Sequence, residues 1–286
     1  MFLGTLDRYS IAGNPDWVNE DLIVEDNEIR LVLDGATGLA DKPYVDEVSD
    51  ARWFVQTIAH SFREHWHSTK KFESSIAAAI SDTRAAFESV HPIANEPDYK
   101  LPAACLIAIA LQDGKFQAYR IGDCSIVDTA NPTCKLFRTP ELEYLDKQAI
   151  DQFSTFLESG FSVTEARERL MPKLRHNRSL INKPNGYAAL SLDPDSWQGM
   201  DCLDLTPYVE HKGKGSFVLM SDGFSAAFDT FDLPIYRQLA ETMAPRLEQI
   251  LSELRMQESR DSDLLGYPRL KVHDDATALH VQIGLA

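Results

Sequence analysis

The sequence lacks a long apolar run, a secretion signal and closely spaced cysteines. No stretch of its 286 residues approaches the roughly 18 consecutive apolar residues that a membrane-spanning helix needs. The first residues, Met1 to Asp7, carry neither the basic flank nor the apolar region of a signal peptide. The four cysteines contain no C-x-x-C pair, so we expect core thiols and no disulfides. We therefore expect a soluble, cytoplasmic protein.

Positive charge is also scarce. The chain has 28 lysines and arginines against 44 aspartates and glutamates, which gives a formal net charge of −16. Such a surface repels the phosphates of nucleic acids and of anionic membranes, so we expect neither as a partner. Divalent ions bound to several aspartates would neutralise part of this excess, and the rest keeps the protein soluble.

One stretch combines a buried strand, a carboxylate and two glycines. The apolar run from Leu31 to Leu33 is typical of a strand covered on both faces, and Asp34 follows at its end. Gly35 and Gly38 allow a tight turn that leaves main-chain carbonyl oxygens uncovered. A carboxylate beside a carbonyl oxygen is a ligand pair that a hard divalent cation prefers.

Four other aspartates also stand at the ends or bends of predicted strands. They are Asp21 before Leu22-Ile23, Asp123 after the strand predicted over 116–121, Asp222 after 216–220, and Asp274 before 278–283. Gathered without cations, these carboxylates would repel one another and take up protons. All-oxygen ligands favour Mg²⁺ or Mn²⁺ over Zn²⁺, and two such ions about 4 Å apart can activate a bridging water and bind a phosphoryl group.

The pattern of strands and helices predicts an α+β fold in which helices cover sheets. Amphipathic helices are predicted from Trp53 to Trp66 and over 72–90, because apolar residues recur there every three to four positions. More polar helices are predicted over 145–157 and 163–174, and a further strand over 186–192. The length is within the range of one large domain.

Five motifs together resemble the metal-dependent protein phosphatases of the PPM (PP2C-like) family. They are Asn19-Glu20-Asp21, Asp34-Gly35-x-x-Gly38, Gly122-Asp123, Ser221-Asp222-Gly223 and Asp274-Asp275-x-Thr277, in the family's order and rough spacing. The resemblance runs from about Gly4 to Ile283. It implies a sandwich of two packed β-sheets flanked by helices on both sides, a single domain of the bacterial type over residues 1–286, and a flap-like helical insertion at about 140–183.

The resemblance also implies a binuclear centre of Mg²⁺ or Mn²⁺. Its implied ligands are Asp34 for both ions, the Gly35 carbonyl for one, Asp222 and Asp274 for the other, Asp21 beside the centre, and Asp123 where many bacterial relatives hold a third ion. Catalysis would depend above all on Asp34 and Asp222. Asp275 stands where asparagine is commoner in the family, and the motif register favours Asp274 as the ligand.

The implied activity is hydrolysis of phosphoserine and phosphothreonine in proteins by a metal-activated water, on substrates of a Ser/Thr kinase. Many relatives bind the substrate phosphate with an arginine five residues before the acid of the N-E-D motif. That position here is Asp16. We therefore predict that Arg8, Arg175 or Arg178 supplies the missing positive charge.

Two alternatives remain open. A catalytically silent relative would use the same fold to bind a phosphorylated partner, which would agree with the acid at Asp16. A phosphohydrolase of the haloacid-dehalogenase type is a minor alternative, because the second acid of its D-x-D-x-T motif would fall on Ala36. A cysteinyl-phosphate mechanism is excluded, since no cysteine is followed six positions later by arginine.

Overall fold

The fold is described from a computed structural model for residues 1–94, 96–132, 134–241 and 246–285. The strands are β1 (Phe2–Ile11), β2 (Asp21–Asp26), β3 (Ile29–Ala36), β4 (Ala103–Gln112), β5 (Lys115–Ile121), β6 (Ser125–Asp128), β7 (Leu190–Ser191), β8 (Asp201–Asp204), β9 (Lys214–Met220) and β10 (Ala276–Gly284). The α-helices are α1 (Asp50–Thr69), α2 (Phe72–Glu88), α3 (Pro140–Glu158), α4 (Val163–Ser179), α5 (Thr206–Lys212), α6 (Asp222–Asp229), α7 (Pro234–Arg237) and α8 (Leu247–Arg260). Short 3-10 helices are η1 (Asp98–Lys100), η2 (Ser196–Gly199) and η3 (Gln238–Ala240).

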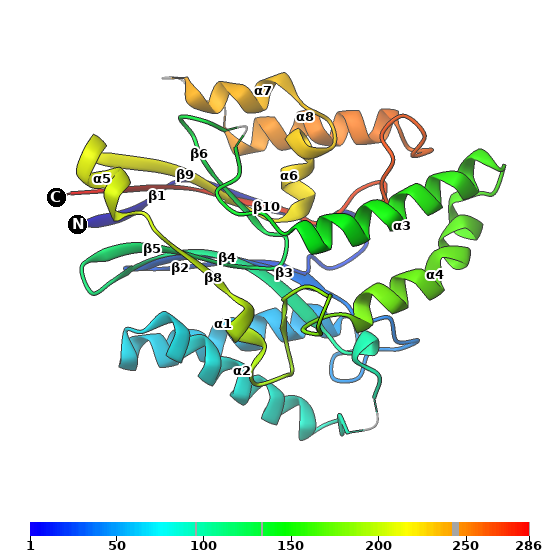
Figure 1. Cartoon of the computed structure of the whole chain (residues 1–286), viewed down its shortest axis with the longest axis horizontal. Coiled ribbons are helices and arrows are strands. Elements are labelled where there is room, and N and C mark those ends of the chain that lie inside the picture. Colours follow the sequence, from blue (N-terminus) through cyan, green and yellow to red (C-terminus); the bar gives the residue numbers. More distant parts are fainter. Residues whose placement is uncertain (95, 133, 242–245, 286) are drawn as a thin grey trace.

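The strands form two antiparallel sheets that pack face to face (Figure 1). One sheet has the order β1-β10-β9-β6, and the other has the order β2-β3-β4-β5-β8, with β7 paired to β4. The first strand therefore pairs with the last, with Phe2 opposite Gly284 and Ser10 opposite Thr277. The ends of these two strands lie side by side in Figure 1.

Helices cover the outer face of each sheet. Leu31 and Leu33 of β3 pack beneath α1 and α2, whereas Val32 between them packs in the core between the two sheets. This two-sided burial explains the continuous apolar run in the sequence. On the other sheet, Val218 and Met220 pack beneath α6, α7 and α8. The predicted α+β fold, a sandwich of two sheets with helices on both sides, is confirmed.

Two neighbouring residues at the start of α1 have different roles: one caps the helix, and the other binds the loop after β3. The side chain of Ser49 caps the helix by accepting a hydrogen bond from Arg52 N at 3.1 Å. The Asp50 carboxylate instead accepts hydrogen bonds from Tyr44 N and Val45 N at 2.7 and 2.9 Å. These bonds fix the loop that follows Asp34 against the helix.

Helices α3 and α4 pack on each other and project from one end of the sandwich (Figure 1). Their shared core includes Phe153, Leu170 and Leu264. Pro140 starts α3, and a capping box between Ser162 and Glu165 starts α4. The pair lies in the segment predicted as a flap-like insertion at about 140–183. Its role as a flap, like the extent of the domain over residues 1–286, stays a prediction.

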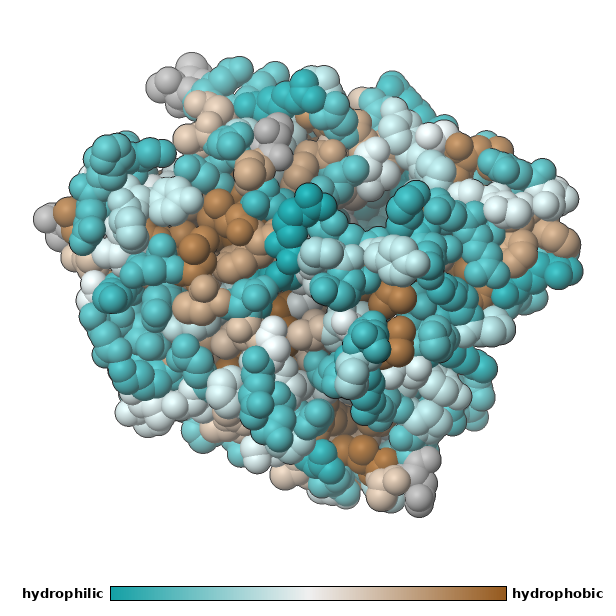
Figure 2. All heavy atoms as spheres, in the orientation of Figure 1, coloured by the Kyte–Doolittle hydropathy of each residue, from teal (hydrophilic) through white to brown (hydrophobic). Residues whose placement is uncertain are grey.

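The surface agrees with the composition. Hydrophilic residues predominate on the face shown in Figure 2, and 25% of the residues are charged. Within the described ranges, no helix has the length and apolar character that crossing a membrane requires.

Candidate metal centre

The strand ends bring the predicted carboxylates together at one end of the sandwich. Asp21 begins β2 and lies directly opposite Asp34, near the end of β3. Asp222 follows β9 at the start of α6, where its main-chain N donates a hydrogen bond of 3.4 Å to Asp34 Oδ2. Residues far apart in sequence are therefore neighbours, because strands of both sheets end or begin at the same end of the sandwich.

Asp123 reaches the same place through a tight turn. Gly122 has a φ of 82°, a conformation that favours glycine, and a Cβ there would overlap the side chain of Cys105. One carboxylate oxygen each of Asp34 and Asp123 and the Cys124 sulfur lie within 4.8 Å of one another. Sequence analysis predicted the two carboxylates and took Cys124 for an ordinary core thiol.

A buried arginine ties this turn to the start of α3. Arg120 is 4% exposed, and its guanidinium donates to the carbonyl oxygens of Gly122 and Arg138 and to the side chains of Thr139 and Asp201. Thr139 Oγ1 also donates to the Gly122 carbonyl at 2.9 Å. The residue before Asp123 is thus held by groups from the base of the α3–α4 pair.

The loop before β10 carries Asp274 and Asp275, which have different partners. Lys271 Nζ donates to Asp274 Oδ1 at 2.6 Å. The Asp275 carboxylate accepts hydrogen bonds from Gly13 N and Glu20 N, at 2.8 and 2.7 Å. Asp275 is thus occupied in joining two loops, which supports Asp274 as the residue available to an ion.

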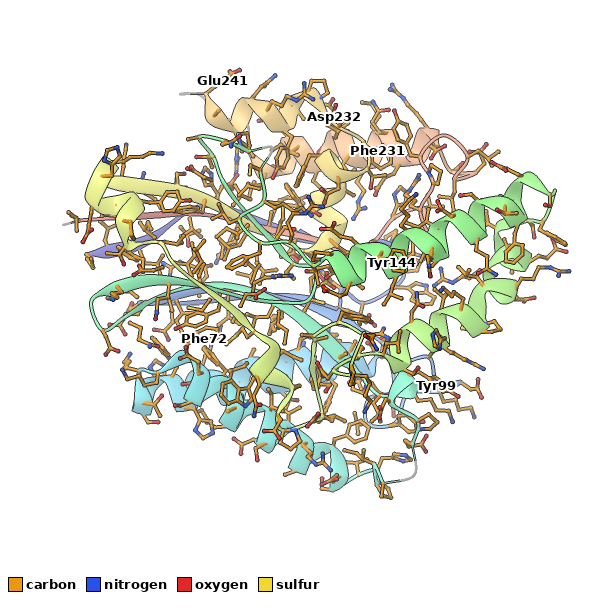
Figure 3. All side chains as sticks on the ribbon, in the orientation of Figure 1. Phe72, Tyr99, Tyr144, Phe231, Asp232 and Glu241 are labelled. Atoms are coloured by element: carbon orange, nitrogen blue, oxygen red, sulfur yellow. The ribbon has the colours of Figure 1, made fainter. Side chains whose placement is uncertain are left out.

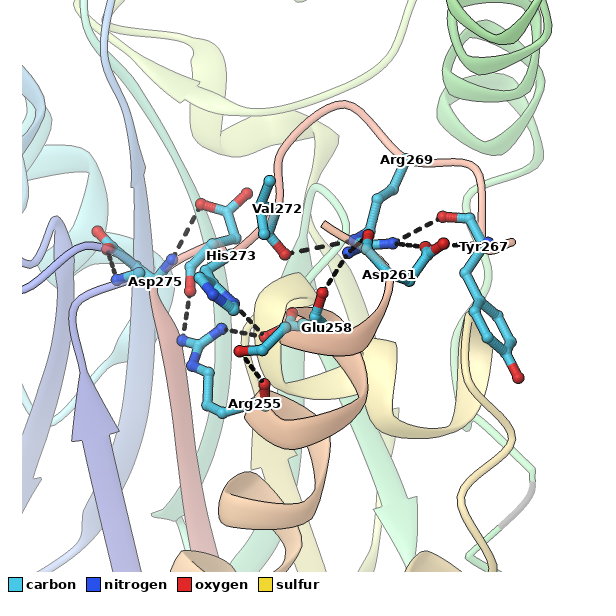
Figure 4. A network of polar contacts seen from close by, with 11 residues as sticks. Arg255, Glu258, Asp261, Tyr267, Arg269, Val272, His273 and Asp275 are labelled. Carbon is cyan, nitrogen blue, oxygen red and sulfur yellow. Dashed lines mark hydrogen bonds and ion pairs between the residues drawn. The ribbon is translucent and has the colours of Figure 1, made fainter. Parts of the chain in front are cut away.

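A buried polar network fixes this loop to α8 (Figure 4). Arg255 donates to the main-chain oxygen of Asp274 at 2.5 Å and to Glu258 Oε2 at 2.8 Å. Glu258 is 3% exposed, and its Oε2 also lies 2.8 Å from His273 Nδ1. Arg269 pairs with Asp261 at 2.5 Å on the other side of the loop. The carbonyl of Asp274 is thereby anchored to a helix.

Burial, together with the crowding of negative charge, raises the pKa of three carboxyl groups. Burial, followed by the charges of Asp275 and Asp274, raises the pKa of Asp21 to about 7, although hydrogen bonds from Ser221 and Thr277 oppose the shift. Burial and the neighbouring carboxylates raise the pKa of Asp34 well above its ordinary value. Burial of the Asp222 carboxyl group and the charges of Asp123 and Asp274 likewise raise its pKa well above its ordinary value. Without cations, the cluster therefore favours protonated acids.

Two buried carboxylate oxygen atoms show that this cluster suits metal ions. Asp21 Oδ2 and Asp123 Oδ1 have no hydrogen-bond partner in the described part of the chain. A buried carboxylate oxygen without a donor is costly, and a bound cation removes that cost. A set of carboxylates is the donor chemistry that Mg²⁺ and Mn²⁺ prefer. The residues present thus fit hard divalent ions.

A cavity of about 240 Å³ adjoins the cluster and is lined by Asp123, by side chains of α3 and α4, and by Lys271. Arg178 also lines it and donates to the Thr37 carbonyl oxygen at 3.0 Å. Burial and the charge of Asp123 raise the pKa of Asp146, another lining residue, to about 7, and Arg178 opposes this shift. A phosphate entering this cavity would meet three cations, Arg167, Arg178 and Lys271.

Sequence analysis missed Lys271. Burial lowers the pKa of its amine, but the charges of Asp274, Asp222 and Asp34 outweigh that effect and raise the pKa above its ordinary value. The amine is therefore charged at neutral pH. Its spacing, three residues before Asp274, is the one signal in the sequence, and it carries little weight without knowledge of the loop's shape.

The three arginines predicted to bind substrate lie in different places. Arg178 lines the cavity beside Asp123. The guanidinium of Arg175 lies 5.6 Å from the ring centre of Tyr99, which is labelled near the end of α4 in Figure 3. Arg8, on β1, pairs with Glu25 and lines a separate hollow with Arg63. Among the described residues, no carboxylate of the cluster lines that hollow.

Comparisons with known proteins agree with this fold. A family model described as "Protein phosphatase 2C" matches residues 18–261, a range that ends before Asp274. The serine/threonine phosphatase PstP/Ppp of Mycobacterium tuberculosis is 17% identical, with a TM-score of 0.55 over 100% of both chains. The catalytic domain of PstP, solved with two manganese ions, is 15% identical, with a TM-score of 0.53 over 98% of this chain and 97% of that one.

The serine/threonine phosphatase Stp1 of Staphylococcus aureus is 16% identical, with a TM-score of 0.52 over 100% of this chain and 98% of that one. Identities this low establish similarity of fold alone. No curated protein matches the chain.

Proposed function

The chain belongs to the protein phosphatase 2C family of metal-dependent protein phosphatases, and we propose that it hydrolyses phosphoserine and phosphothreonine in proteins at a centre of two Mg²⁺ or Mn²⁺ ions. The observation that carries this proposal is the meeting of Asp21, Asp34, Asp123 and Asp222 at one end of the sandwich, with two buried oxygen atoms that lack a hydrogen-bond partner among the described residues. A Ser/Thr kinase acting on the same substrates would complete the cycle.

The positions of these side chains support the proposed ligands. Asp34 lies between Asp21 and Asp222, so it is the residue able to serve both ions. Asp222 and Asp274 would share one ion, since the charge of Asp274 reaches Asp222 and helps to raise its pKa. The Gly35 carbonyl is proposed for the other ion, and Asp123 for a third. When bound, the ions supply positive charge to the phosphoryl group and lower the pKa of a water molecule.

Other residues of the chain would orient the substrate. Arg178 and Lys271 line the cavity beside Asp123, and their charges can receive two phosphate oxygens. Thr37 holds the Arg178 guanidinium through its carbonyl oxygen, and Asp274 holds the Lys271 amine. Apolar side chains of α3 and α4, including Leu142 and Leu170, line the same cavity and reduce the access of bulk water.

The direct test is a phosphatase assay on p-nitrophenyl phosphate and on a phosphothreonine peptide. We expect hydrolysis of both with Mn²⁺ or Mg²⁺, loss of activity after chelation, and recovery when either metal is restored. Activity that survives thorough chelation would overturn the two-metal proposal.

A second candidate function is favoured by Asp16. This acid lies on an exposed loop, where its main-chain N donates to Asn14 Oδ1 at 3.0 Å. A silent member of the family would bind a phosphorylated partner without hydrolysing it. Full metal occupancy by calorimetry, tight binding of a phosphopeptide and no turnover would establish that function instead. The haloacid-dehalogenase alternative is not retained, since the family match assigns the chain elsewhere.

A further inference from the structure

Cys124 brings sulfur to an otherwise oxygen-lined cluster. It directly follows Asp123 and is 2% exposed. Its Sγ and one carboxylate oxygen each of Asp34 and Asp123 lie within 4.8 Å of one another. Among the described residues, this is the group of acidic, histidine or cysteine side chains with a spacing suited to one metal ion.

The backbone on either side of Cys124 is fixed. The turn at Gly122 precedes it, and β6 begins at the next residue, with Ser125 opposite Met220 of β9. Asp34 is likewise fixed in β3, opposite Cys105 of β4. Asp34 therefore lies in a strand, and Asp123 and Cys124 lie in a short turn held between two strands.

Buried acceptors in the same cluster point to a cation. Asp123 Oδ1 is buried and has no hydrogen-bond partner among the described residues. Asp21, which is 7% exposed and lies opposite Asp34, has a second such oxygen, Oδ2. We propose that Asp34, Asp123 and Cys124 form a mixed oxygen and sulfur site that binds one thiophilic divalent ion, of the class of Zn²⁺, Co²⁺ or Cd²⁺.

Ligand chemistry distinguishes this site from one for Mg²⁺. Zinc binds sulfur at about 2.3 Å and carboxylate oxygen at about 2.0–2.2 Å, so two ligands of one ion lie at most about 4.5 Å apart. Small side-chain rotations bring atoms within 4.8 Å of one another into that range. Mg²⁺ takes oxygen ligands, and sulfur adds nothing to its binding. As the sulfur–metal bond forms, the thiol proton leaves to solvent, and no electrons are transferred.

The shared carboxylate gives the site a consequence for the proposed function. Asp34 is proposed to hold both catalytic ions, so a thiophilic ion on Asp34, Asp123 and Cys124 competes with them. Zn²⁺ should therefore inhibit the Mg²⁺-dependent reaction, and the inhibition should depend on Cys124. This consequence rests on the proposed function, whereas ion binding by the thiol does not.

Cobalt gives a readout that needs no enzymatic activity. The full-length, metal-free protein is titrated with Co²⁺ while absorbance follows the charge-transfer band of a cobalt–thiolate bond and calorimetry counts bound ions. We expect the band to saturate at one equivalent in the wild type, to persist in Cys105→Ser and to be lost in Cys124→Ser. Cys105 is the matched control, because it is also a buried thiol beside Asp123.

A second variant provides a test that does not depend on whether Cys124→Ser folds correctly. Replacing Cys105, Cys134 and Cys202 together by Ser leaves Cys124 as the single thiol, and the band should remain. Bound Co²⁺ without a band in the wild type, or a band that survives Cys124→Ser, would overturn the proposal.

Inhibition provides an independent measurement. Even the loss of a group that supports a metal ligand typically costs 10–100-fold in affinity, so Cys124→Ser should raise the half-inhibiting Zn²⁺ concentration at least about tenfold. Cys105→Ser should leave it unchanged. A protein that shows the cobalt band but no phosphatase activity would support this metal site and refute the proposed function. An active protein without the band would support the proposed function and refute this metal site.

Discussion

At the scale of single residues, Asp34 and Asp222 are directly linked, because the main chain of one donates to the carboxylate of the other. We predict that Asp34→Ala or Asp222→Ala lowers kcat at least about a hundredfold, since each removes a proposed ligand of the ion pair. Asp123→Ala should lower kcat while two ions remain bound. Calorimetry with Mn²⁺ measures the stoichiometry. Wild-type turnover and stoichiometry in Asp222→Ala would refute the assignment of that motif.

The positions of the four candidate cations lead to a second prediction. Arg178 and Lys271 line the cavity, so Arg178→Ala and Lys271→Ala should each cost about 1.5–3 kcal/mol in kcat/KM on p-nitrophenyl phosphate and on a phosphopeptide. Arg175→Ala should affect the peptide alone if its side chain only docks the polypeptide. Arg8→Ala is the matched control, because Arg8 pairs with Glu25 in a separate hollow.

Kinetics of the four variants separates these roles. Equal kcat/KM values for wild type, Arg178→Ala and Lys271→Ala on both substrates would mean that neither side chain binds the phosphate, which leaves the ions and Arg167, the third cation of the cavity. A loss in Arg8→Ala would show that the hollow beside β1 serves the substrate after all.

At the scale of elements, α8 fixes the loop that carries Asp274. We predict that Glu258→Gln weakens binding of the ion proposed for Asp274 about tenfold, because Arg255 then loses its charged partner and the Asp274 carbonyl loses a fixed donor. Mn²⁺ calorimetry measures this affinity. Glu248→Gln, on the exposed face of the same helix, should have no effect. If Glu258→Gln lowers the melting temperature but leaves both metal affinities intact, the network is structural only.

The elements also show why some predictions from the sequence succeeded and others failed. β3 and β9 were predictable because their apolar runs are buried on both faces, and the carboxylates at their ends follow from the same pattern. The strand predicted over 186–192 was wrong for most of its length, since only Leu190–Ser191 forms one. The Asn182 side chain donates to Ala189 O and accepts from Ala189 N, so the main-chain groups of Ala189 have hydrogen-bond partners without pairing to a neighbouring strand.

Contacts between distant loops were not predictable from local pattern. Lys271 and Cys124 matter because of what the fold places beside them, namely Asp274 and Asp34. In the sequence, Lys271 is marked only by its place three residues before Asp274, and Cys124 only by its place after Asp123. Sequence reasoning therefore predicted the carboxylates at strand ends and missed the other side chains of the same cluster.

At the scale of the whole molecule, the raised pKa values make stability depend on pH and metal. An unfolded aspartate has a pKa of about 3.9, and in the folded, metal-free protein that of Asp21 rises to about 7. Between these values the folded state binds more protons than the unfolded state, so stability falls as pH rises through this window. We predict that the melting temperature of the chelated protein falls between about pH 4 and pH 7.

Saturating Mn²⁺ should prevent most of this fall in melting temperature, because the ions take the place of the protons. The difference in melting temperature between the Mn²⁺-loaded and the chelated protein should therefore widen as pH rises. Asp21→Asn, which mimics the protonated acid, should flatten the pH dependence of the chelated form. A chelated wild type whose stability is flat or rising across the window would contradict the assignment of these shifts.

The position of β10 between β1 and β9 also has a consequence for how the chain is made. Of the described strands, β10 is the last to leave the ribosome, yet it is the strand through which β1 joins its sheet. Asp274 and Asp275 directly precede it, so the loops around Gly13 and Glu20 gain their carboxylate partner only at that time. A partly synthesised chain therefore exposes the edges of β1 and β9 to other chains, and the phosphatase centre assembles after translation of its last strand.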